Sequence, residues 1–99
     1  MTKSYDIDLV TELTAAERSE IRMGLDARAT TLLRNLTLAE GCQGVDSWAY
    51  KNGQEVLGTV VNAYRKVCGT HDAFESWIDS FRESDSLRLR VALRNRPEN

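Results

Sequence analysis

The only proline of the chain is Pro97, so no residue upstream of it interrupts a helix through a missing backbone N–H. Glycines then mark the helix ends: Gly41, Gly44 and Gly69 each follow apolar residues spaced three or four positions apart. This pattern predicts a few helices separated by short turns. Because no repeat or linker divides so short a chain, we expect residues 1–99 to form a single small domain.

The clearest predicted helix covers residues 15–39. Thr14 and Glu17 have the spacing of a capping box, in which each side chain accepts a hydrogen bond from the other residue's backbone amide. The apolar residues that follow share one helical face. They are Ile21, Leu25, Ala29, Leu32 and Leu36.

A second helix is predicted after Asn52-Gly53. Apolar residues with helical spacing run from Val56 to Val67, and Gly69 ends the pattern. Asn-Gly is also a common hairpin turn, but the period of the residues that follow favours a helix.

A short helical turn over residues 46–50, capped by Asp46, is expected to precede that second helix, and Thr70 is expected to cap a third. One face of the third helix carries Phe74, Trp77, Ile78 and Phe81. The core is expected to contain the apolar residues of all three helices, chiefly Ile21, Leu25, Leu32, Val60, Val61, Tyr64, Trp77 and Phe81.

The two ends of the chain alternate apolar and charged residues, acidic over residues 5–9 and mostly basic over residues 87–93. Leu, Arg and Ala favour a helix at the second segment, but the period of two predicts strands, whose apolar side chains share one face. The opposite charges favour pairing of the two strands. The predicted fold class is therefore α+β, mainly α, with three main helices, one short turn and two short terminal strands that pair.

A small chain buries little apolar surface, and strand edges with unpaired backbone are usually covered. We therefore expect a homodimer joined through these terminal strands. With 41% apolar residues and a net charge of −2, the composition excludes a disordered chain and a strongly basic one. No apolar run is long enough for a membrane span or a secretory signal, so we expect a cytoplasmic protein with free thiols at Cys42 and Cys68.

The best candidate for catalysis or metal binding is the pair Cys68 and His71, in a Cys-x-x-His spacing. Zinc sites use two spaced pairs of ligands, and His71 is the only histidine. A thiolate nucleophile needs the imidazole within hydrogen-bonding reach and a third group that orients it, which the sequence does not indicate. We therefore expect no metal, no cofactor and no catalysis, and a small enzyme using Cys68 and His71 is the third hypothesis.

The candidate partner-binding residues are Trp48, Tyr50 and Lys51, which lie between the long apolar stretches. Exposed Trp and Tyr are the residue types that dominate binding hot spots. The alternative is that Trp48 folds inward and fills the core, as large aromatic residues usually do.

The C-terminal segment is a second candidate surface, because arginine binds phosphates and carboxylates alike. Its candidate nucleic-acid-binding residues are Arg88, Arg90, Arg94 and Arg96. The acidic balance of the chain argues against this surface. The sequence favours a small non-catalytic cytoplasmic protein that docks on a protein partner as a regulator or inhibitor, with nucleic-acid binding through the arginines as the alternative.

Overall fold

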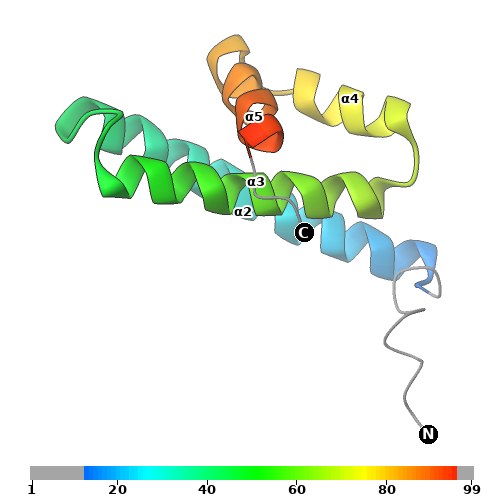
Figure 1. The fold of residues 1–99 in the computed structure, drawn as a ribbon. Coiled ribbons are helices and arrows are strands. Elements are labelled where there is room, and N and C mark those ends of the chain that lie inside the picture. Colours follow the sequence, from blue (N-terminus) through cyan, green and yellow to red (C-terminus); the bar gives the residue numbers. More distant parts are fainter. Residues whose placement is uncertain (1–12, 96–99) are drawn as a thin grey trace, which may run out of the picture.

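The computed structural model describes residues 13–95, and within them the chain forms helices and no strand (Figure 1). The described helices are, in chain order, α2 (Ala15–Cys42), α3 (Trp48–Cys68), α4 (His71–Asp79) and α5 (Glu83–Asn95). The predicted α+β class is therefore wrong, and the described part of the chain is all-α. None of these helices is both long and apolar enough to cross a membrane.

The start of α2 confirms the predicted capping box. The Thr14 amide donates to Oε1 of Glu17 at 2.9 Å, and the Glu17 amide donates to Oγ1 of Thr14 at 3.0 Å. The helix continues to Cys42, three residues beyond the prediction. The chain then turns at Gly44, whose φ of 88° is a conformation that favours glycine.

The start of α3 differs from the prediction, because the expected short turn over residues 46–50 is continuous with the long helix. Its cap is Ser47 rather than Asp46, with Oγ of Ser47 accepting from the Tyr50 amide at 3.2 Å. Asn52 and Gly53 lie inside the helix. The predicted end at Gly69 and the predicted cap at Thr70, which begins α4, are confirmed.

Antiparallel packing of α2 against α3 makes a helical hairpin, and α4 and α5 lie over α3 (Figure 1). Near one end of the hairpin, Nη1 of Arg18 donates to the carbonyl oxygen of Val67 at 3.4 Å. Near the other end, the Leu36 side chain lies against Gly53, where a Cβ would come within 2.9 Å of it. α3 contacts each of the other three helices and is therefore the centre of the fold.

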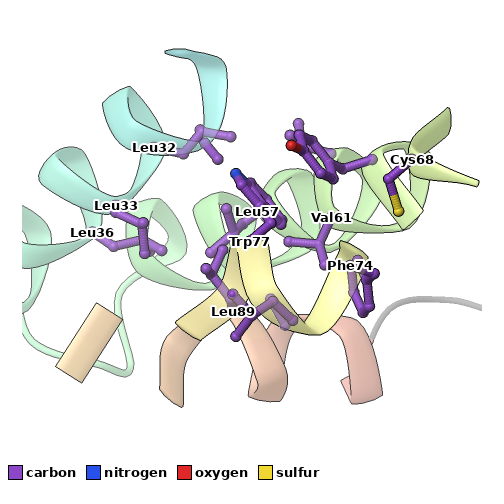
Figure 2. Close-up of a cluster of buried hydrophobic side chains, with 14 residues drawn as sticks. Leu32, Leu33, Leu36, Leu57, Val61, Cys68, Phe74, Trp77 and Leu89 are labelled. Atoms are coloured by element: carbon purple, nitrogen blue, oxygen red, sulfur yellow. The ribbon is translucent and has the colours of Figure 1, made fainter. Parts of the chain in front are cut away.

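Side chains from all four described helices form one core (Figure 2). The buried residues include Leu32, Val60, Val61, Tyr64 and Trp77, as predicted. Leu25 and Phe81 are partly buried and pack against this core. The prediction for Ile21 is wrong, because its side chain is 38% exposed. The buried residues of α2 all lie between positions 29 and 36, so its N-terminal turns add little to the core.

Residues 87–93 are helical, and the strand predicted for them is wrong. Leu89 and Ala92 are buried at a spacing of three, while Leu87 is 56% exposed. The helix preference of Leu, Arg and Ala therefore outweighs the period of two. Residues 5–9, the expected partner strand, lie outside the described residues. A dimer joined through paired terminal strands is consequently not proposed further.

The indole of Trp77 joins three helices. It stacks on the ring of Tyr64 in α3, with ring centroids 3.8 Å apart and planes 9° apart. Its Nε1–H donates to Oδ1 of Asp26 in α2 at 2.7 Å. On the other side, the ring of Phe81 meets it edge-on at 5.3 Å. Stacking of aromatic rings and a short hydrogen bond to a carboxylate thus stabilise the same side chain.

We predict that truncating Trp77 destabilises the protein and that truncating Trp48 does not. Trp77→Ala removes a buried indole and its hydrogen bond, and is expected to lower the free energy of unfolding by about 3–5 kcal/mol. Trp48→Ala, on the surface, is the matched control and is expected to change the free energy of unfolding of the monomer by less than about 0.5 kcal/mol. Urea titration followed by far-ultraviolet circular dichroism measures both. Equal destabilisation by the two variants would contradict the assigned core.

Candidate functional site

Trp48 is the first residue of α3 and lies on the surface. The loop before it is held by Ser47, whose hydroxyl donates to the carbonyl oxygen of Gly44 at 2.8 Å while Oγ accepts from the Tyr50 amide. This cap fixes the direction in which α3 begins. The Trp48 side chain is 76% exposed, so it does not fill the core. For so large an apolar residue, such exposure is typical of a binding surface.

Beside Trp48 lies a groove between α2 and α3 with a volume of about 290 Å³. We call it the Trp48 groove. Its lining residues come only from these two helices: Arg28, Leu32, Asn35, Leu36, Ala39, Trp48, Ala49, Asn52, Gly53 and Val56. Among them Arg28 carries the only charge. The Trp48 groove therefore combines apolar walls with two side-chain amides and a single cation.

Tyr50 belongs to a different face of α3 from Trp48. A step of two residues turns about 200° around a helix, so the Trp48 and Tyr50 side chains lie on nearly opposite sides of α3 although they are close in sequence. Tyr50 is half-buried and packs against the core. Burial lowers the pKa of the Arg88 guanidinium, but hydrogen bonds to Tyr50 and Glu40 outweigh burial and raise it. Lys51 is exposed. The three predicted partner-binding residues thus do not form one patch.

The C-terminal arginines are also dispersed by the helix. Arg88 extends to α2, where it pairs with Glu40 and donates to Oγ1 of Thr37 at 3.0 Å. Arg90 extends to α4, where it pairs with Glu75 and Asp79, each at 3.0 Å. Arg94 is exposed, and Arg96 lies outside the described residues. Two of the four predicted phosphate ligands are therefore occupied by carboxylates of the same chain.

Cys68 and His71 have different neighbours. The buried Sγ of Cys68 lies 3.4 Å from the carbonyl oxygen of Arg65 and 3.5 Å from that of Thr70. Nε2 of His71 lies 3.8 Å from the Glu75 carboxylate, with its side chain largely exposed. In the part of the chain that the structure describes, no group of three or more His, Cys, Asp or Glu side chains is placed to hold a metal ion.

Arg28, Asn35 and Asn52 are the groove residues that the sequence reasoning missed. Arg28 and Asn35 are seven positions apart, a spacing that puts them on one face of α2. This spacing is visible in the sequence. Asn52 is different, because the sequence predicts that the second helix starts only after Asn52-Gly53. Comparison of the chain with models of known families, with curated proteins and with solved structures finds no match.

The two cysteines are both free thiols, and we predict that they differ in reactivity. Cys42 is exposed and is expected to react with a disulfide reagent within the mixing time of a manual assay. Buried Cys68 is expected to react only as fast as the protein opens, because the thiolate must be accessible. Counting thiols with the native protein and in denaturant measures this. Fast labelling of a Cys42→Ser variant under native conditions would contradict it.

Tyr64 provides a prediction at alkaline pH. Burial raises the pKa of its phenol above 10.0, with smaller contributions from Asp26 and Cys68, while Arg22 lowers it. The folded state therefore holds this proton more tightly than the unfolded state. Stability is expected to be retained below pH 10 and to fall as the pH rises from there through the folded pKa. Across this range the unfolding free energy of the native chain should fall relative to that of Tyr64→Phe, which lacks the titrating group; a constant difference between the two would contradict the prediction.

Proposed function

We propose that the protein is a small non-catalytic binding protein that regulates or inhibits a protein partner by docking through the Trp48 groove. The observation that carries the proposal is the 76% exposure of the Trp48 indole beside an apolar groove. We also infer a cytoplasmic setting, because Cys42 and Cys68 are free and a reducing compartment keeps thiols in that form.

The indole and the groove complement each other as a docking surface. Removing apolar area from water contributes roughly 25 cal/mol per Å², and a tryptophan offers more of it than any other residue. The side-chain amides of Asn35 and Asn52, which also line the groove, provide donors and acceptors that fix the orientation of a partner. Apolar contact with a polar rim is the usual composition of a protein interface.

The alternative, nucleic-acid binding, has weaker support. Binding to nucleic acid depends chiefly on cations that contact phosphates. The Trp48 groove carries one such cation, Arg28, and Arg88 and Arg90 are paired with carboxylates of their own chain. Catalysis through Cys68 and His71 has weaker support still, because no contact joins the two side chains in the described structure.

The test starts with affinity capture from the source cells, followed by reconstitution with the captured protein. We predict that Trp48→Ala weakens its binding by about tenfold or more, because truncating a hot-spot tryptophan removes about 2 kcal/mol or more. The matched control is Leu87→Ala, which removes an exposed apolar side chain from α5 and is expected to leave the affinity unchanged. Titration calorimetry measures both.

Equal affinities of the native chain and the Trp48→Ala variant would contradict the proposed surface. Binding to random-sequence DNA or RNA that weakens steeply with salt and survives Trp48→Ala would favour the nucleic-acid alternative instead.

A further inference from the structure

We infer that the Trp48 groove is occupied by a second copy of this chain, in a two-fold dimer that inserts each Trp48 at the far end of the partner's groove. The inference rests on one element of the proposed function, that the Trp48 groove is a protein-binding surface, and it names a second copy of the chain as an occupant of that surface. Its basis is the arrangement of side chains along the groove, which is self-complementary. An interface between identical copies requires this property, since each contact must occur twice.

Trp48 and Arg28 lie at opposite ends of the groove. The contacts between Leu36 and Gly53 and between Arg18 and Val67 fix the antiparallel register of α2 and α3. In this register Ala39 lies beside the start of α3. Arg28 is eleven residues before Ala39, which corresponds to about 16 Å along α2.

A two-fold axis through the middle of the groove exchanges its ends. The partner subunit's Trp48 then reaches Arg28, and the reverse contact forms at the other end. A guanidinium over an indole face is a favourable cation–π pair, and it becomes stronger when both groups leave water. Arg28 is exposed and Trp48 is 76% exposed, so both side chains are accessible for this contact.

The middle of the groove fits the same symmetry. Asn35 and Asn52 line it between the two ends, and both are exposed. Residues near a two-fold axis meet their own copies, and like charges there would repel. An amide has a donor and an acceptor, so it can hydrogen-bond to an identical amide. No charged residue lines this middle section.

The dimer also covers the face of the hairpin that the other two described helices leave open. No residue of α4 or α5 lines the groove, whereas Leu32, Leu36 and Val56 do. A chain of this size buries a smaller share of its surface on folding than a larger domain does, so covering this face adds apolar burial to a modest core. Docking of a different protein on the Trp48 groove and self-association through it exclude each other.

The test is the molar mass of the chain by sedimentation equilibrium. The native chain is expected to be a dimer, with twice the monomer mass of 11.2 kDa, at micromolar concentration. Trp48→Ala and Arg28→Ala are each expected to raise the dimer dissociation constant about tenfold or more. Because both remove the same contact, the double variant is expected to weaken the dimer no further than the stronger single variant.

Asn35→Lys is the most direct test of the two-fold axis, since it puts like charges near that axis. Lys favours a helix more than Asn does, so the exposed substitution is not expected to disturb α2. It is expected to be monomeric, with unchanged circular dichroism. The control Leu87→Ala, on the exposed face of α5, is expected to remain dimeric.

Two outcomes overturn the inference. The first is a native chain that stays monomeric even at 100 times the micromolar concentration of the first measurement, and the second is a dimer that persists in the Asn35→Lys variant. Either result leaves the proposed function standing if a different captured protein still binds in a Trp48-dependent way. Conversely, a Trp48-dependent dimer that captures no other protein supports the inference while the regulatory proposal fails.

Discussion

The side chain of Trp77 anchors α4 to the α2–α3 hairpin. α4 has nine residues, too few to be stable as an isolated helix, so its position must come from packing. The stack on Tyr64 and the hydrogen bond to Asp26 hold it against both helices of the hairpin. α5 packs directly on α3 and also contacts α4, and side chains of all these helices share one core (Figure 2).

Local chemistry explains which parts of the fold the sequence predicted. Helix caps and helix ends involve residues within about one helical turn of each other, so the sequence alone predicts them. Examples are the caps at Thr14 and Thr70 and the helix end at Gly69. Residues 87–93 are different, because alternating Leu and Arg residues also place Leu89 and Ala92 on one helical face. Both the period of a strand and that of a helix fit this segment, and helix propensity together with packing against α3 selects the helix. The apolar spacing also predicts burial of Ile21, but burial depends on whether another helix packs on that face of α2 as well as on the spacing.

In the candidate site, too, the sequence predicts what depends on neighbouring residues but not what depends on packing between helices. Trp48 could be singled out from residue type and position, but whether its indole faced the core or water depended on where α3 begins. Tyr50 was grouped with it by adjacency, and one half-turn of helix separates them. The arginines of the last segment are clustered in the sequence but not in space, since Arg88 pairs with a residue of α2 and Arg90 with a residue of α4. The groove itself exists only once α2 lies against α3.

The contrast between the two tryptophans has an optical consequence. An indole packed against a tyrosine ring and an indole in water differ in emission wavelength and in access to a soluble quencher such as iodide. The structure places one of each in a chain with two tryptophans. Emission from Trp77 then reports unfolding, and the quencher-sensitive emission from Trp48 reports anything that covers the groove. The protein thus carries two intrinsic fluorescent reporters, one for its interior and one for its surface.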